Sequence, residues 1–295
     1  MVRRCIVSVV GGVALLVALG CGGSDVEKDP FEEGLRSLSI FDFEVAYKNL
    51  SIAVEQMDPS DPQWIEAAYA LGIAAWHQSP SRAEYIRQAT ELFEQIAETT
   101  DQKELKYRCY LNLARILEVP DYVGDAKDIE GARSYYEETL EAMPGTDVGS
   151  QANFRLAQTY LEQMNDESFQ EAVMIVTDYL NEYPDAPLAN VGWQFVADIQ
   201  KFYLNNREAA LEAMMKAYDL GFAVQSKEDV YIWQIADLAM GLDQNAEAVE
   251  FLTTLVKHYP RSKYRWVARE ELKRLAEENP EMNIEIPELT AYGEV

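Results

Sequence analysis

The sequence is poor in histidine and cysteine, two of the side chains that most often carry out catalysis or bind metals. It contains two histidines, His77 and His258, and three cysteines, Cys5, Cys21 and Cys109. The histidines lie far apart without metal-ligand spacing around either, and no GxSxG, HExxH or glycine-rich phosphate loop is present. These absences argue against an enzyme, a cofactor and a metal site, and we predict none of the three.

One acidic loop offers an alternative to that prediction. The stretch PDYVGDAKDIEG contains Asp121, Asp125, Asp128 and Glu130, and clustered carboxylates can bind calcium. Their spacing does not match the alternating ligands of an EF-hand loop. Asp128 also suits the N-cap position of the helix that follows, so a capping role is favoured over calcium binding.

Basic residues are also scarce. The chain has 25 Lys and Arg against 51 Asp and Glu, which gives a formal net charge of −26. Such a surface repels phosphate backbones, so nucleic-acid binding through a basic footprint is excluded. The acidic charge either keeps a helical protein in solution or forms a docking surface for a basic partner.

The apolar run at the N-terminus is too short to be a retained membrane span. Residues 6–20 form a stretch of 15 residues, whereas a membrane-spanning helix needs about 20. Arg3 and Arg4 precede this stretch and Cys21 ends it, which is the order of an export signal. The polar stretch GGSDVEKDP follows, and it suits a flexible tether.

The junction Ala18-Leu19-Gly20-Cys21 resembles the bacterial lipoprotein signal, although the two positions before Gly20 are exchanged. The resemblance implies a signal peptide over residues 1–20, a lipid on Cys21 and a tether over residues 21–30. It also implies an outer-membrane location facing the periplasm, because Gly22 stands where an aspartate marks inner-membrane retention. An ordinary signal peptidase would accept the same bond and leave Cys21 unmodified.

An internal repeat runs through the rest of the chain. An alanine is followed by a bulky residue four positions later and by a helix breaker twelve positions later. The alanines are spaced by 43, 43, 40, 37 and 39 residues. Three sets match fully, namely Ala132, Tyr136 and Pro144, then Ala172, Val176 and Pro184, then Ala248, Leu252 and Pro260; weaker copies are Ala46 with Leu50, Ala89 with Phe93, and Ala209 with Gly221.

Each of these predicted helices is preceded by another that carries its own small residue. Small residues on two neighbouring helices let the backbones approach closely, so each repeat predicts a helical hairpin. In the second, third and fourth units the interval between the paired small residues is longer, which predicts longer turns. The small residues of the first helices are Gly34, Gly72, Ala114, Ala157, Ala197 and Ala236.

The pattern around Ala236, Ala248 and Pro260 resembles the tetratricopeptide repeat, whose small residues recur at the same intervals of twelve. The resemblance implies an all-α, right-handed superhelical solenoid of about six hairpins over residues 31–278. A C-terminal capping helix is expected at about 262–278, and an acidic tail at 279–295. The cations assigned to the cap are Arg261, Lys263, Arg265, Arg269, Lys273 and Arg274.

One face of each first helix is predicted to line a binding groove. This face lies beside the packing face of the helix, and its residues stand at the same sequence offsets from the small residue in each repeat. They combine aromatic, amide and charged side chains. Such residues suit a peptide or an extended chain. The alternative is a merely solvated face. The predicted groove residues are Tyr69, Trp76, Arg108, Arg115, Gln151, Phe154, Gln194, Asp198, Lys201, Trp233 and Asp237.

The resemblance implies a non-catalytic, lipid-anchored scaffold that binds envelope proteins or peptide segments, with envelope or outer-membrane assembly as one expected role. The junctions EYPDAPLAN and KHYPRSKYR are similar to those of repeat lipoproteins from the bacterial envelope. One alternative is a lipoprotein that captures glycan or peptide. Another is a soluble periplasmic repeat protein without a lipid.

Overall fold

A computed structural model of the chain describes residues 29–289. The predicted signal peptide and Cys21 lie outside the described residues. Within them, all regular structure is helical, with thirteen α-helices, three short 3-10 helices and no strand. None of these helices is both long enough and apolar enough to cross a membrane.

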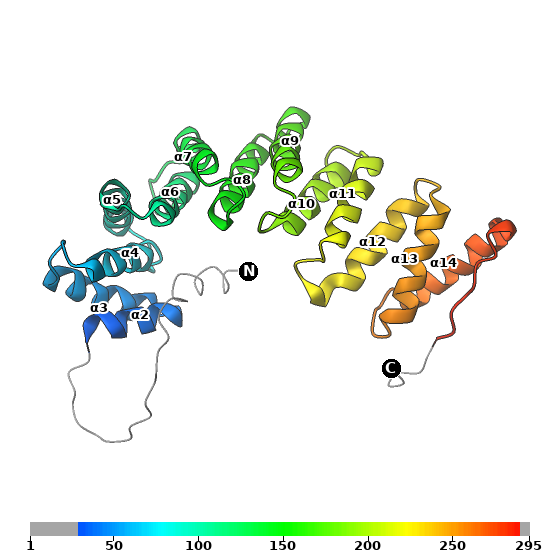
Figure 1. The fold of residues 1–295 in the computed structure, drawn as a ribbon, viewed down its shortest axis with the longest axis horizontal. Coiled ribbons are helices and arrows are strands. Elements are labelled where there is room, and N and C mark those ends of the chain that lie inside the picture. The colour runs from blue at the N-terminus through cyan, green and yellow to red at the C-terminus, as the bar shows by residue number, and fades with distance from the viewer. Residues whose placement is uncertain (1–28, 290–295) are drawn as a thin grey trace, which may run out of the picture. The chain divides into compact units, whose positions relative to one another are not determined.

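The α-helices alternate between a first and a second member of a hairpin (Figure 1). The first helices are α2 (Pro30–Ser39), α4 (Pro62–Trp76), α6 (Lys103–Glu118), α8 (Asp147–Tyr160), α10 (Ala189–Phe202) and α12 (Glu228–Met240). The second helices are α3 (Phe43–Gln56), α5 (Ala83–Thr99), α7 (Ile129–Ala142), α9 (Asp166–Glu182), α11 (Arg207–Asp219) and α13 (Asn245–His258). A final helix follows, α14 (Arg265–Glu278), and the 3-10 helices are η1 (Leu161–Gln163), η2 (Gln225–Lys227) and η3 (Pro280–Met282).

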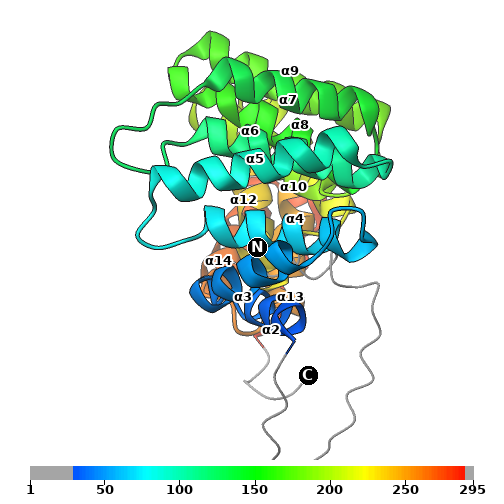
Figure 2. The same cartoon turned by 90° about the vertical axis from the view of Figure 1, so that its left-hand side faces the viewer.

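The chain forms two compact units with separate hydrophobic cores. Unit 1 extends to Tyr136 and unit 2 begins at Glu137, so the boundary falls inside α7. In unit 1, α4, α5 and α6 pack in succession (Figure 2). In unit 2, α8 packs on α9, α10 on α11, and α12 on α13. The predicted fold of six hairpins and a closing helix is confirmed.

The small residues of the first helices allow the close contact that defines each hairpin. A Cβ atom added to Gly34 would lie 2.6 Å from Leu50 Cγ, and one added to Gly72 would lie 2.8 Å from Phe93 Cε1. Leu50 and Phe93 are the bulky residues of the repeat pattern, and both are fully buried. The second helix therefore occupies the space that a larger first-helix residue would need.

The fifth copy of the repeat is shifted by one residue from the predicted register. The pattern places its alanine at Ala209, with Gly221 as the helix breaker. In the structure Ala209 is half-buried, whereas Ala210 is fully buried and Met214, four residues later, is 2% exposed. Ala210 and Met214 therefore fill the positions of the alanine and the bulky residue. The prediction was wrong here because each of two adjacent alanines matches one part of the pattern: Ala209 precedes the breaker Gly221 by twelve residues, whereas Ala210 precedes the bulky Met214 by four.

Short turns join the two helices of most hairpins in one recurrent way. Phe41, Met164, Asn205 and Asp243 each have φ between 49° and 63°. Each comes immediately before the N-cap of a second helix, so a left-handed residue reverses the chain. Longer turns join α4 to α5 and α6 to α7, and η1 extends the turn after α8, as the longer intervals predict.

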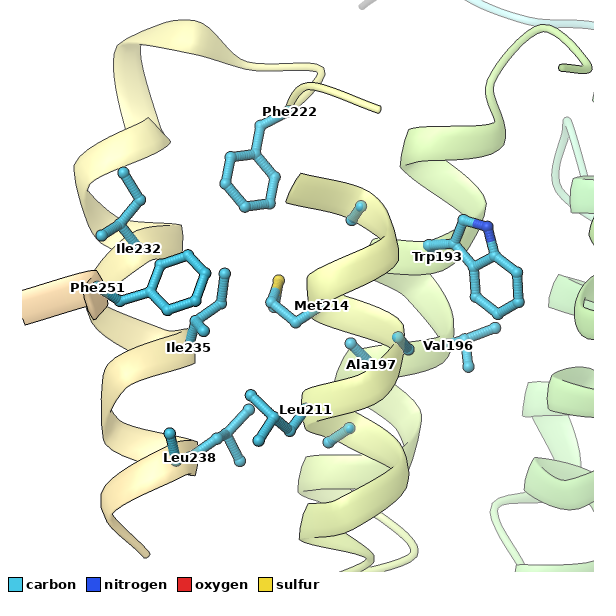
Figure 3. Close-up of a cluster of buried hydrophobic side chains, with 14 of the residues drawn as sticks. Trp193, Val196, Ala197, Leu211, Met214, Phe222, Ile232, Ile235, Leu238 and Phe251 are labelled. Atoms are coloured by element: carbon cyan, nitrogen blue, oxygen red, sulfur yellow. The ribbon is translucent and has the colours of Figure 1, made fainter. Parts of the chain in front are cut away.

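The core of unit 2 shows how successive hairpins share apolar side chains (Figure 3). Met214 on α11 lies among Ile235 of α12, Phe251 of α13 and Phe222 of the intervening turn. On the other side of the same hairpin, α10 contributes Trp193. Because each helix buries side chains against both neighbours, removal of one hairpin would expose apolar surface on the next.

The last helix and the tail close unit 2. Helix α14 begins at Arg265, three residues later than predicted. Arg265 does not belong to a solvated polar face, because it is 7% exposed and its Nε donates to the Val256 carbonyl at 3.1 Å. Residues 283–289 have no regular secondary structure, and Ile284, Ile286 and Leu289 pack against the core. Arg269 Nε donates to the Pro287 carbonyl at 3.0 Å.

We predict that Gly72→Ala lowers the free energy of unfolding by about 1–3 kcal/mol, because the new methyl group overlaps the fully buried Phe93 ring. The intrinsic helix preference of alanine acts in the opposite direction by about 1 kcal/mol. Urea denaturation measures the net effect. In a Phe93→Leu background, Gly72→Ala should lower the free energy of unfolding by much less. Equal costs in both backgrounds would show that the Gly72–Phe93 contact does not limit the packing.

Candidate binding faces on the first helices

All eleven predicted groove residues lie at or near the surface of their own unit. Asp198 and Asp237 are exposed, and the other nine are half-buried. We call Tyr69, Trp76, Arg108 and Arg115 the unit-1 face. We call Gln151, Phe154, Gln194, Asp198, Lys201, Trp233 and Asp237 the unit-2 face.

The unit-1 face centres on Trp76, at the end of α4. The Arg115 guanidinium of α6 lies 4.6 Å from the centre of the indole ring, within range of a cation–π interaction. Trp76 Nε1 donates to Asp121 Oδ2 at 3.2 Å, in the turn that follows α6. Burial raises the pKa of Asp121, while the indole donor and Arg115 oppose that rise. Two helices and a turn therefore hold one indole in place.

Tyr69 occupies the same face one turn earlier on α4. Asn112 Nδ2 of α6 donates to its hydroxyl at 3.1 Å. Desolvation raises the pKa of Tyr69 to about 12, so the phenol is neutral and can also donate a hydrogen bond. Arg108 instead pairs within α6, with 2.7 Å between its Nη2 and Glu104 Oε1. The unit-1 face thus combines an indole, a neutral phenol and two guanidinium groups.

His77 is the C-cap residue of α4, in the turn where the sequence places it, and it lies between two aromatic rings. Its ring centre is 4.8 Å from that of Phe43 and 4.8 Å from that of Trp76. Burial, assisted by the positive charge of Arg115, lowers the pKa of His77. The residue packs behind the unit-1 face in its neutral form.

The unit-2 face joins three successive first helices. Phe154 of α8 makes an edge contact with Phe195 of α10, with 5.1 Å between ring centres. Lys201 Nζ of α10 is 3.6 Å from Asp237 Oδ2 of α12. Trp233 of α12 stacks on Tyr264, before α14, at 5.2 Å and an interplanar angle of 5°. Each first helix therefore contacts the next through residues of this face or their direct neighbours.

The two amide side chains of the unit-2 face make no hydrogen bond to a neighbouring helix within residues 29–289. Gln151 Nε2 donates to Asp147 Oδ2 at 2.9 Å inside its own helix, so it joins no neighbouring helix through that bond. Gln194 Nε2 is buried and has no hydrogen-bond partner among the described residues. A buried amide donor without a partner is costly, and a ligand carbonyl would relieve that cost.

Three residues of these surfaces were missed in the sequence. Asn112, Asp121 and Phe195 contact predicted face residues but do not lie at the face positions that the repeat defines. Asn112 is a buried polar residue inside a helix, which is an unusual placement and the one signal that singles it out. Asp121 lies in a turn of irregular length, where helical spacing gives no guide.

The carboxylates proposed as calcium ligands are engaged in the turn itself. Asp125 accepts from the backbone N–H groups of Asp121 and Ala126, at 2.9 and 3.0 Å. Asp128 Oδ1 accepts from the Gly131 N–H at 2.9 Å, so Asp128 caps α7 as the favoured alternative predicts. Among the described residues, no cluster of three His, Cys, Asp or Glu side chains has the arrangement of a metal site.

Comparison with known proteins identifies the repeat. A family model described as a tetratricopeptide repeat matches residues 231–262, which cover most of α12 and α13. No curated protein sequence matches the chain. Among solved structures the chain is similar to "Assembly Chaperone of RpL4 (Acl4) (Residues 1-338)", at 17% identity and a TM-score of 0.40, over 87% of this chain and 99% of that one.

The matched repeat and the hairpins of both units define the class. The described residues form an all-α protein of six helical hairpins, and the tetratricopeptide repeat model matches the sixth of them. The family match covers the sixth hairpin, where the small-residue intervals are the most regular.

The lowered pKa of His77 predicts a pH dependence of stability. Since the folded state favours the neutral ring, the unfolded chain takes up the proton first as the pH falls through the ordinary histidine value of about 6.5, and stability is lost there. His77→Gln should reduce the loss of unfolding free energy between about pH 7.5 and pH 5.5. His258→Gln, at the exposed end of α13, is the matched control. The same loss in both variants would contradict the assignment.

Proposed function

We propose that this protein is a non-catalytic scaffold whose first-helix faces hold an extended segment of another protein. The observation that carries the proposal is the unit-2 face, where three separate contacts join successive elements: Phe154 of α8 with Phe195 of α10, Lys201 of α10 with Asp237 of α12, and Trp233 of α12 with Tyr264 before α14. Aromatic and cationic side chains are the ones that anchor protein partners.

We propose further that Cys21 carries a lipid and that the scaffold acts on the periplasmic side of a bacterial outer membrane. The Gly20-Cys21 junction, the apolar stretch before it and the polar residues after it support this location. Several acyl chains on one residue would keep the protein on its membrane. A binding protein that catalyses no reaction acts mainly through its location. A role in envelope or outer-membrane assembly fits a binding protein held at that membrane.

Capture of a small ligand is the second candidate, and one observation weighs against it in unit 1. The pocket enclosed by α5, α6 and α7 has a volume of about 50 Å³, with Thr90, Leu113 and Tyr135 among its lining residues. That space holds a few water molecules. Drug-sized ligands fill pockets of roughly 300–1,000 Å³. The faces of the first helices are a better site for an extended chain.

Site-specific photo-crosslinking tests the binding face. A photoreactive residue at Asp198 or Asp237, both exposed on the unit-2 face, should crosslink in intact cells to a defined protein partner. The matched controls are Gln170 and Met174, exposed on the second helix α9. Crosslinks of equal yield at all four positions, or at α9 alone, would contradict binding on the first helices.

Thiol titration tests the anchor. Cys109 is 0% exposed, and burial raises its pKa to about 12, so the native protein should not expose this thiol to Ellman's reagent. The reagent then reports on Cys21 alone. A lipidated chain should give no signal until it is unfolded, and then one thiol. A reactive thiol in the native mature chain, together with recovery from the soluble fraction, would refute lipidation without affecting the binding face.

A further inference from the structure

A cation-rich corner between α13 and α14 stands apart from the rest of this acidic protein. From residue 251 to residue 269 the sequence contains no Asp or Glu, although 51 acidic residues occur in the whole chain. The same stretch contains five Lys and Arg residues and His258. In Figure 1 the turn between these two helices lies at the lower edge of unit 2.

The side chains of this corner are largely in solvent. Lys257, Arg261 and Lys263 are exposed. Trp266 is 67% exposed and Val267 is 47% exposed, in the first turn of α14. An indole exposed to this degree is unusual, because Trp is normally well buried in the folded state. We call Lys257, Lys263, Trp266 and Val267 the corner patch.

The charges of the corner patch are available to a partner. Neither Lys257 nor Lys263 forms an ion pair among the described residues. Lys263 Nζ lies 4.8 Å from the centre of the Tyr264 ring, which itself stacks on Trp233. Burial raises the pKa of Tyr259, and Glu228 and Asp229 of α12 add to that rise. These two carboxylates therefore act on Tyr259, on the α12 side of the corner.

The composition of the corner patch fits a lipid surface. Trp and flanking Lys and Arg are the residues that settle at the membrane–water interface, where the ring enters the headgroup region and the long cationic chains remain beside the phosphates. The patch lies on a turn and the first turn of a helix, so it offers protruding side chains. A fluid bilayer surface accepts such side chains without a matching pocket.

We propose that the corner patch binds the surface of an anionic phospholipid membrane, with Trp266 inserted at the interface. The contact is independent of Cys21, because it belongs to unit 2 and to residues of the folded repeat. The net charge of −26 repels the same surface elsewhere on the chain. Binding should therefore be sensitive to salt and restricted to this corner.

The experiment uses residues 22–295, which keep every described helix and remove both Cys21 and the apolar stretch before it. Binding is measured by flotation with vesicles of phosphatidylcholine and phosphatidylglycerol, and with vesicles of phosphatidylcholine alone. We expect binding to the anionic vesicles only. Because a cation near an anionic surface contributes about fivefold, Lys257→Gln with Lys263→Gln should weaken binding by an order of magnitude.

The matched control is Lys48→Gln with Lys103→Gln, which removes two exposed lysines from unit 1 and makes the same change in net charge. This control should bind with an affinity within about twofold of the parent chain. Circular dichroism confirms that all variants are folded. Equal weakening in both double variants, or equal binding to both kinds of vesicle, would overturn the proposal.

Quenching of tryptophan fluorescence by brominated phosphatidylglycerol reports on insertion. Trp64 and Trp193 are 6% exposed, Trp76 and Trp233 are half-buried, and Trp266 is 67% exposed. Most of the quenching in the parent chain should therefore be lost in Trp266→Phe. Quenching that persists in this variant would place the membrane contact elsewhere. If the chain binds no vesicles and the lysine variants instead lose an acidic protein partner in crosslinking, the patch is a protein-docking site and the membrane proposal is wrong.

Discussion

The close contact between a small residue on the first helix and a bulky residue on the second is the constraint on which both units depend. Gly34 with Leu50 and Gly72 with Phe93 show it most directly, because no Cβ atom fits between the partners. The contact fixes the distance between the two helices of a hairpin. It also commits one face of every first helix to packing, so the neighbouring face remains for contacts with the next first helix and with partners.

The same packing constraint affects which helices carry the acidic side chains. The second helix α9 carries five acidic residues and no Lys or Arg, whereas the first helix α6 carries four cations and two acids. Since the packing faces have no room for charge, the carboxylates collect on the remaining surface of the second helices. The partner-facing chemistry of the first helices is accordingly more aromatic and amide-rich, with charges that are paired, as in Lys201 with Asp237.

The fold could be predicted from the sequence because its determinants are local and periodic. Few residues describe each hairpin, namely an alanine, a bulky residue four positions later and a breaker after the helix. The structure confirms all six predicted hairpins. The pattern fails where two adjacent residues each satisfy one part of it, as Ala209 and Ala210 do, because burial depends on the rotation of the helix. The prediction of a polar cap also fails at Arg265, because its guanidinium donates to the Val256 carbonyl instead of lying in solvent.

The candidate faces were predictable to the extent that they follow the helical repeat. Tyr69 and Trp76 lie where the spacing places them. Their hydrogen-bond partners could not be predicted in this way, because Asn112 reaches Tyr69 through packing between helices and Asp121 reaches Trp76 from a turn of irregular length. These contacts give the faces their rigidity. Trp76 is held by Arg115 on one side and Asp121 on the other, so the indole is oriented before any partner arrives and less side-chain entropy is lost on binding.

The contacts of the unit-2 face also link binding to the stacking of the repeats. Lys201 and Asp237 belong to successive first helices, and Trp233 stacks on the residue that precedes α14. A chain laid across these residues touches several hairpins at once and favours the spacing at which all of them are in contact. Binding of the proposed partner would therefore stabilise the stacked state of unit 2, and a change in stacking would alter the affinity by the same factor, because the two equilibria would be thermodynamically linked.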